Sequence, residues 1–227
     1  MRGVILAGGK GTRLKPLTDI SNKHLLGVYN KPMILYPLET LKSMGVTDIL
    51  LVSGGEHIGG FTQFLGDGSK YDVKLTYKVQ EEAGGIAQAL LLAEDFVDDE
   101  FAVILGDNIF EYAPAKPVKG CGLVIKEVDD PERFGVYNDK KIVEKPAIPL
   151  SNMVVTGCYF YTPEIFPFLK TLQPSARGEM EISDLNNWVL ENLPTFIVEY
   201  SGFWSDAGTF DSLLRSANHI HSQKSGV

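Results

Sequence analysis

The chain has 227 residues, of which 44% are hydrophobic, and a formal net charge of −8 at pH 7. This size suits one α/β domain, and no run reaches the roughly 18 apolar residues of a membrane span. The acidic balance argues against a nucleic-acid polymer as ligand, which would need a concentrated basic surface, so we expect a cytoplasmic protein without a membrane or nucleic-acid partner.

Short apolar runs typical of buried parallel strands recur along the chain, at residues 3–7, 48–53, 73–79, 101–105 and 153–161. Helical patterns separate the first four runs. One covers residues 32–44, where Pro32 suits a first helical turn and Gly45 a stop, and another covers 85–94. Strands that alternate with helices predict a mostly parallel central sheet covered on both faces.

The pattern changes after Asp107, where short strand-like runs at 121–128, 134–139 and 140–145 are separated by polar turns. These runs predict a small β insertion and a mixed sheet. An amphipathic helix is predicted over 179–193, and a last helix is expected to begin near Gly208.

The cysteines and the distribution of charge limit the kinds of binding site that we expect. Cys121 and Cys158 form no CxxC pair, so we expect reduced core thiols rather than a disulfide framework or a thiolate metal site. The first 31 residues carry six lysines and arginines against one aspartate. A small anion is therefore the expected ligand near the N-terminal end.

The segment LAGGKGTRL places glycines directly after the first strand, where α/β proteins bind phosphate. It fits neither common nucleotide motif. A Walker loop needs lysine after its last glycine, but Thr12 follows Gly11, and a dinucleotide motif begun at Gly9 fails at Leu14. A P-loop ATPase and an NAD-dependent oxidoreductase are both disfavoured.

A longer set of blocks runs in order from about residue 1 to 215: LAGGKGTRLKPLT, SNKHLLGVYNKPMI, VQEEAGGIAQA, ILGDNIF, DDPERFGVY, VEKP, VTGCYFY and FWSDAGT. This set resembles the sugar-phosphate nucleotidyltransferases, in particular the short-chain glucose-1-phosphate thymidylyltransferases. The resemblance implies a Rossmann-like, three-layer (GT-A-like) fold in a single domain, residues 1–227. The nucleotide-binding part would cover about 1–110 and the sugar-phosphate-binding part about 111–215.

The implied reaction joins dTTP and glucose 1-phosphate into dTDP-glucose and pyrophosphate, with Mg²⁺ as cofactor. Such in-line phosphoryl chemistry needs positioned cations and a metal more than a nucleophile of the protein. Arg13 can fork onto the departing phosphates, and the resemblance adds Lys23 there and Lys145 at the sugar phosphate. Asp107 follows a central strand, where ligands of open α/β sheets bind. The catalytic set is thus Arg13, Lys23, Asp107 and Lys145.

The resemblance implies three further sets of contacts. Nucleotide contacts are expected from Leu6, Ala7, Gly8, Gly9, Gly11, Thr12, Arg13, Gln80, Gly85 and Asp107. Sugar-phosphate contacts are expected from Asn108, Gly135, Glu144, Lys145, Val155, Tyr159 and Trp204. The metal ligands are expected to be Asp107 and Asp206. The Gln80 amide can pair with the edge of thymine or of uracil, and Tyr159 and Trp204 could equally be core aromatics.

Two departures from the family pattern are visible. His24 stands where family members commonly have a glutamine that contacts the nucleotide sugar, so the preference for a 2′-deoxy sugar is less sharply implied. Longer family members continue into C-terminal helices that help to form a regulatory site, and we expect that site to be missing here.

Other functions compete with this interpretation. The nearest is a UTP- or CTP-using enzyme of the same fold. A glycosyltransferase would fit Asp107-Asn108 but has no pyrophosphate for the Arg13 loop to hold. A non-catalytic nucleotide-sugar sensor is disfavoured by the joint presence of Arg13, Lys23, Asp107, Lys145 and Asp206. The sequence leaves the oligomeric state, including a homo-oligomer, open.

Overall fold

The computed structural model describes residues 1–225, and in this part of the chain nine strands form one central sheet. Its parallel half has the order β6-β1-β4-β5. The bounds are β1 Arg2–Leu6, β4 Asp48–Gly54, β5 Lys74–Gln80 and β6 Phe101–Leu105. The carboxyl ends of these four strands therefore lie at one edge of the sheet, where open α/β sheets bind ligands.

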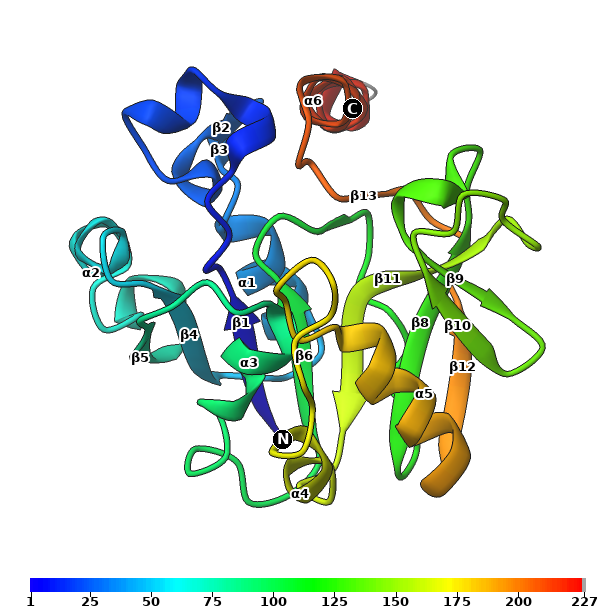
Figure 1. Ribbon diagram of the computed structural model, residues 1–227. Helices are drawn as coiled ribbons and strands as arrows, with labels where there is room; N and C mark the ends of the chain where they lie inside the picture. Colours follow the sequence, from blue (N-terminus) through cyan, green and yellow to red (C-terminus); the bar gives the residue numbers. More distant parts are fainter. Residues whose placement is uncertain (226–227) are drawn as a thin grey trace.

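The other half of the sheet is mixed (Figure 1). Its bounds are β8 Cys121–Glu127, β9 Gly135–Asn138, β10 Lys141–Glu144, β11 Met153–Tyr161 and β12 Thr195–Glu199. β11 runs antiparallel to β6, β8 and β9, whereas β12 runs parallel to β8. The predicted β insertion thus continues the main sheet through the β9–β10 hairpin instead of forming a sheet of its own.

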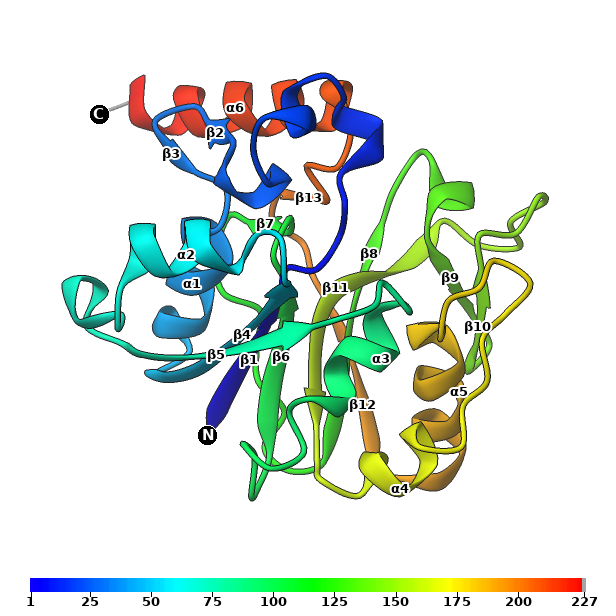
Figure 2. The same cartoon turned by 60° about the vertical axis from the view of Figure 1, so that its left-hand side comes forward.

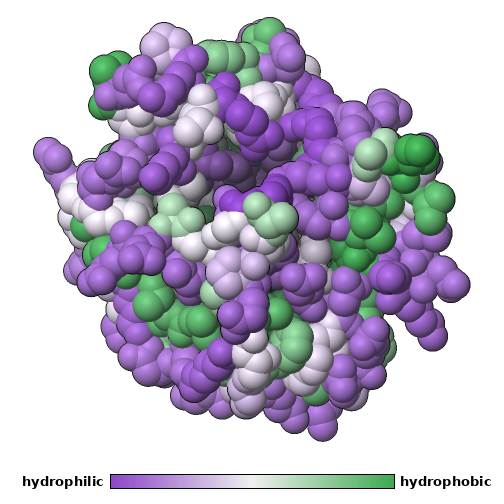
Figure 3. Space-filling view, viewed as in Figure 1, coloured by the Kyte–Doolittle hydropathy of each residue, from purple (hydrophilic) through white to green (hydrophobic). Residues whose placement is uncertain are grey.

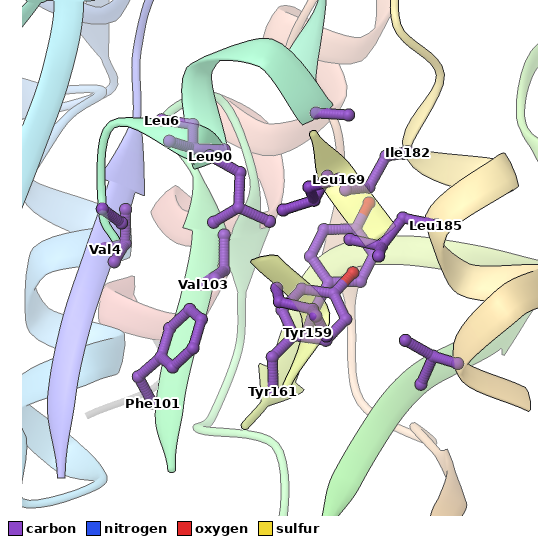
Figure 4. Close-up of a cluster of buried hydrophobic side chains, with 14 of the residues drawn as sticks. Val4, Leu6, Leu90, Phe101, Val103, Tyr159, Tyr161, Leu169, Ile182 and Leu185 are labelled. Carbon is purple, nitrogen blue, oxygen red and sulfur yellow. The ribbon is translucent and has the colours of Figure 1, made fainter. Parts of the chain in front are cut away.

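Helices cover both faces of the sheet, which gives three layers (Figures 1 and 2). One face carries α3 Ile86–Leu91, α4 Ile165–Leu169 and α5 Ile182–Asn192, and the other carries α1 Leu35–Ser43 and α2 Ile58–Leu65. Successive side chains of a strand point to opposite faces, so Val4 and Leu6 pack in the first core and Ile5 in the second. Figure 4 shows the first core, where the rings of Tyr159 and Tyr161 lie side by side.

A smaller unit lies beyond the carboxyl edge of the sheet, at the top of Figure 2. It contains the hairpin of β2 Gly27–Val28 and β3 Lys31–Pro32, the pair of β7 Ile109–Phe110 and β13 Trp204–Ser205, and α6 Phe210–Ser225. The short 3-10 helices are η1 Thr12–Leu14, η2 Leu17–Asp19, η3 Lys23–Leu25, η4 Ser69–Tyr71 and η5 Pro131–Arg133. The smaller unit of β2, β3, β7, β13 and α6, which we call the roof unit, covers the edge of the sheet where the glycine loop lies.

Most predicted elements are present, but three helix boundaries were wrong. Pro32 does not begin a helix, because it pairs with Gly27 in a hairpin, and α1 starts only at Leu35. The helix predicted from 85 to 94 is shorter, ending at Leu91. The helix predicted from 179 starts at Ile182, because the backbone of Met180 bonds to Gly84 and Ala87 instead.

Two other expectations can be compared with the described residues. Cys121 and Cys158 are free, buried thiols, as predicted. None of the helices described within residues 1–225 combines the length and the apolar character needed to cross a bilayer.

Candidate active site

A cleft of about 590 Å³ opens at the carboxyl edge of the parallel strands, between the sheet and the roof unit. In the space-filling view of Figure 3, hydrophilic residues gather around the hollow on this face. Its walls carry charges of both signs: Lys10, Arg13, Lys23, Arg133 and Lys145, and Asp107, Glu144, Glu179 and Asp206. A cleft with this mixture can hold a polyanion together with a metal cation.

The glycine loop forms one wall. Gly11 has a left-handed backbone (φ 66°), and a Cβ there would lie 2.8 Å from Thr18 Cγ2 and 3.0 Å from Lys23 Cβ, so glycine is required. Arg13 follows in η1, and its Nη2 lies 3.1 Å from the position that a Cβ on Gly208 would take. The loop thus brings Arg13 next to the segment that contains Asp206, while Lys23 packs against Gly11.

Asp107 lies just past the end of β6, and the side chain of Lys23 reaches it from η3. The ammonium of Lys23 forms an ion pair with Asp107 Oδ2, and Asn108 Nδ2 donates to Asp107 Oδ1 at 2.9 Å. Burial is the largest single effect and pushes the pKa of Asp107 upward, but the charge of Lys23 and the hydrogen bonds from Lys23 and Asn108 together outweigh it. The pKa lies below its ordinary value, so Asp107 is a carboxylate.

The buried side chain of Asn108 forms hydrogen bonds with three segments of the chain. Its Oδ1 accepts hydrogen bonds from Gly157 N at 2.9 Å and from Trp204 Nε1 at 2.7 Å. Gly157 lies in a bulge of β11, where the pairing with β8 shifts between Val155 and Tyr159. Because both ends of the Asn108 amide bond within the protein, this residue fixes Asp107 and Trp204 relative to β11.

Asp206 lies across the cleft on the roof unit. Its Oδ2 accepts from Arg133 Nη2 at 2.8 Å, and Arg133 Nη1 also pairs with Asp130 at 2.5 Å. The other oxygen of Asp206, Oδ1, is buried and has no hydrogen-bond partner among the described residues. A buried oxygen of this kind calls for a cation or a donor from a ligand.

The donor set fits a hard divalent cation. Within residues 1–225, no three His, Cys, Asp or Glu side chains form a group that could enclose a metal. Asp107 and Asp206 supply oxygens from two walls of one cleft. One or two carboxylates completed by phosphate oxygens and water is the coordination that Mg²⁺ favours.

Gln80 ends β5 at the far wall. Its Nε2 donates to Gln88 Oε1 at 2.7 Å and to Gly85 O at 3.2 Å, so the amide nitrogen is already bonded within the protein. The carbonyl Oε1 lies 2.4 Å from where a Cβ on Gly8 would be. In this arrangement Gln80 offers an acceptor, rather than the donor-and-acceptor pair expected from the sequence.

Gly85 permits a close backbone contact. Its φ is 99°, and a Cβ there would lie 2.6 Å from Met180 O. A side chain at this position would push apart the start of α3 and the segment before α5. The absence of a side chain is therefore needed for the shape of the cleft itself.

His24 lines the cleft but can no longer donate into it. Asn22 Oδ1 accepts from His24 N at 2.8 Å and lies 2.7 Å from His24 Nδ1, which must carry the ring proton because the amide oxygen only accepts. Burial, reinforced by the charge of Lys23, lowers the pKa of His24 to about 3. The ring is neutral at pH 7, and its Nε2 is left as an acceptor.

The opposite end of the cleft contains Glu144 and Lys145, at the end of β10. Ser183 Oγ donates to Glu144 Oε2 at 2.5 Å, and Arg177 Nη2 and Lys145 Nζ lie 3.4 and 3.5 Å from Glu144 Oε1. Lys145 has a left-handed backbone (φ 43°) and bonds through its N–H to Phe134 O. Such strain in a non-glycine residue is common at functional positions.

For Tyr159 and Trp204 the sequence left two roles open, a contact with the sugar phosphate or a place in the hydrophobic core. Both are buried and belong to the hydrophobic cores, yet both line the cleft. Burial raises the pKa of Tyr159 well above its usual range, so its hydroxyl stays protonated. Trp204 packs on Phe134 with ring centroids 5.2 Å apart.

The cleft brings together nearly all residues that the sequence singled out. Lining positions include Leu6, Gly8, Gly9, Gly11, Thr12, Arg13, Lys23, Gln80, Gly85, Asp107, Asn108, Gly135, Glu144, Lys145, Val155, Tyr159, Trp204 and Asp206. Ala7 is fully buried and does not line it; its N–H bonds to Val52 O.

Sequence reasoning missed several lining residues. Arg133 lies in the block DDPERFGVY, whose arginine was the available signal. Ser183 and Asn186, near the start of α5, gave no signal because they read as ordinary helix positions.

Comparisons with known proteins agree with this geometry. The chain matches the family model "Nucleotidyl transferase" over residues 2–223. It is 43% identical to a glucose-1-phosphate thymidylyltransferase of Neisseria meningitidis, covering 97% of this chain and 82% of that protein. It is 41% identical to one of Mycolicibacterium smegmatis, with the same coverage of both chains.

Solved structures show the same fold. A crystal structure from Bacillus anthracis, described as a glucose-1-phosphate thymidylyltransferase in complex with sucrose, is 46% identical with a TM-score of 0.88 and covers 96% of this chain and 94% of that one. A UDP-glucose pyrophosphorylase complexed with UDP-glucose has a TM-score of 0.83 at 22% identity, covering 98% of each chain. The three-layer nucleotidyltransferase fold expected from the sequence is confirmed, and the chain belongs to the nucleotidyl transferase family.

Proposed function

We propose that this protein transfers a thymidylyl group from dTTP to glucose 1-phosphate, giving dTDP-glucose and pyrophosphate. The observation that carries the proposal is one cleft with a cationic glycine loop at one end and the Glu144-Lys145 pair at the other. The relatives named above, 41 to 46% identical, support the choice of dTTP and of glucose 1-phosphate.

The nucleotide would bind along the glycine loop. We assign the triphosphate to Gly8, Gly9, Gly11, Thr12 and Arg13. Backbone N–H groups of such a loop can point at phosphate oxygens, and a guanidinium can fork onto the two phosphates that leave as pyrophosphate. Leu6 and Gly85 would border the base, whose N3–H can donate to Gln80 Oε1.

The sugar phosphate would lie at the other end. Glu144 would accept hydrogen bonds from sugar hydroxyls, while Lys145 would pair with the sugar phosphate. Gly135, Val155, Tyr159 and Trp204 would complete the sugar pocket. An oxygen of the sugar phosphate would then attack the α-phosphorus, and the bond from that phosphorus to the oxygen that links the α- and β-phosphates would break, so that pyrophosphate leaves with that oxygen.

Catalysis would rest on holding charges in place. Arg13, Lys23 and Lys145 supply positive charge, and Asp107 and Asp206 would hold Mg²⁺, which as a Lewis acid stabilises charge on phosphate oxygens. The single domain would then divide near residue 110 into a nucleotide part and a sugar-phosphate part.

A substrate panel tests the proposal. The purified chain is mixed with glucose 1-phosphate, Mg²⁺ and one of dTTP, UTP, CTP or ATP, and pyrophosphate release and the sugar nucleotide are measured. We expect the highest kcat/KM with dTTP. Lys145→Met should abolish most of the activity, whereas Lys15→Met, which removes a charge paired with Asp19 outside the cleft, should not. A wild-type protein without transfer activity for any nucleotide would contradict the proposal.

A further inference from the structure

The ammonium of Lys23 lies between two groups that a substrate complex would need. On one side it pairs with Asp107 Oδ2, and both side chains are nearly buried, with exposed fractions of 12% and 13%. On the other side Nζ lies 3.4 Å from where a Cβ on Gly9 would be, so it borders the glycine loop. A small movement of one flexible side chain would carry this charge from the carboxylate toward the loop.

Both oxygens of Asp107 are already bonded. Oδ1 accepts from Asn108, and Oδ2 has the Lys23 ammonium. A divalent cation that bound to Oδ2 would meet a positive charge on the same oxygen at a site with little water to screen it. Asp206 differs, because Arg133 pairs with its Oδ2 only and its Oδ1 has no partner among the described residues.

We propose that Lys23 is the resident counter-ion of Asp107 in the nucleotide-free protein, and that metal and nucleotide displace it together. The metal takes over Asp107 Oδ2, while the freed ammonium gains phosphate oxygens at the glycine loop. Each ligand thus removes an obstacle to the other, and linkage requires that the coupling be equal in both directions. This inference rests on the proposed metal site at Asp107, and it adds an order to events: the metal binds weakly until nucleotide arrives.

The test measures Mn²⁺ binding without nucleotide, from the electron paramagnetic resonance signal of free Mn²⁺. Lys23→Met should bind Mn²⁺ about tenfold more tightly than the wild type, a factor that corresponds to about 1.4 kcal/mol. Lys10→Met is the matched control, since Lys10 lines the same cleft, whereas the ion pair with Asp107 in residues 1–225 is made by Lys23. Lys23→Gln keeps a donor for Asp107 without the charge and should behave like Lys23→Met, which guards against poor folding of one variant.

The outcomes separate this inference from the function on which it rests. If Lys23→Met and Lys23→Gln bound Mn²⁺ no more tightly than the wild type, or if Lys10→Met bound it as tightly as they do, the counter-ion role would be overturned. Thymidylyl transfer by the wild type would be untouched by that result. The double variant Lys23→Met/Asp107→Asn should lose the gain. If the gain persisted, the metal would not bind at Asp107, and the proposed metal site would fall with the inference.

Discussion

Replacing Asn108 with alanine tests the network that fixes Asp107 and Trp204. The side chain is 2% exposed and makes three hydrogen bonds, to Asp107, Gly157 and Trp204, at 2.7 to 2.9 Å. Alanine leaves two buried N–H donors without an acceptor, each costing about 1–3 kcal/mol, and removes one bond to a charged group. We expect the free energy of unfolding to fall by about 3–5 kcal/mol, a large share of the roughly 5–15 kcal/mol typical of native proteins.

Urea denaturation followed by circular dichroism measures this loss. Asn192→Ala is the control, because its exposed amide makes a single local bond to Trp188 O, and it should cost less than about 0.5 kcal/mol. Asn108→Asp keeps an acceptor for Gly157 and Trp204 but places a second carboxylate against Asp107. It should therefore also lose stability, because two like charges would meet at a buried site. If Asn108→Ala cost less than about 1 kcal/mol, the buried donors would have other partners and the network argument would be wrong.

Three further predictions concern the cleft. Arg13→Ala should lower kcat by about 10²-fold or more with little change in unfolding free energy, because it removes one preorganised charge; wild-type turnover would exclude the pyrophosphate role. Asp107→Asn and Asp206→Asn should each raise the Mg²⁺ concentration for half-maximal rate, and an unchanged Mg²⁺ titration of both would rule out a shared metal. The pKa of His24 is about 3 in the folded chain, against 6.5 for a free imidazole in the unfolded chain. Between these values only the unfolded chain binds a proton at His24, so the free energy of unfolding falls as the pH drops from about 6.5 toward 3. Between pH 7 and 5, the free energy of unfolding should therefore fall by about 2 kcal/mol less in His24→Gln than in the wild type. If the two proteins gave parallel curves of unfolding free energy against pH, His24 would not be a buried, neutral side chain.

The strands could be predicted because their cause is local. The run FAVIL was predicted as a strand and is β6, and residues 153–161 are β11 with the same bounds. Apolar runs of this length, bounded by glycine or polar residues, favour buried strands whatever surrounds them. The ends of helices depended more on distant contacts. The backbone of Met180 bonds to Gly84 and Ala87, about 95 positions away, and this pairing delays α5 until Ile182.

The candidate site residues were identified from the order of short motifs in the sequence. Eighteen of the nineteen residues named line one cleft, because the motifs follow strands or turns at its edge. What each side chain can donate or accept was decided by the tertiary structure. A neutral His24 ring has one N–H to donate, and Asn22 accepts it. Gln80 was expected to offer both a donor and an acceptor, but Gln88 and Gly85 use its nitrogen.

The sequence by itself determined the fold class, the family and the residues that gather at the carboxyl edge of the sheet, because hydrophobic periodicity and the motif order are properties of the chain. Only the tertiary structure decided how the charges there are paired. Lys23 and Asp107 are 84 positions apart, and Arg133 and Asp206 are 73 apart. No local pattern encodes such pairs: they form because the sheet and the roof unit bring the side chains together in a cleft with little water, where each charge must find a partner.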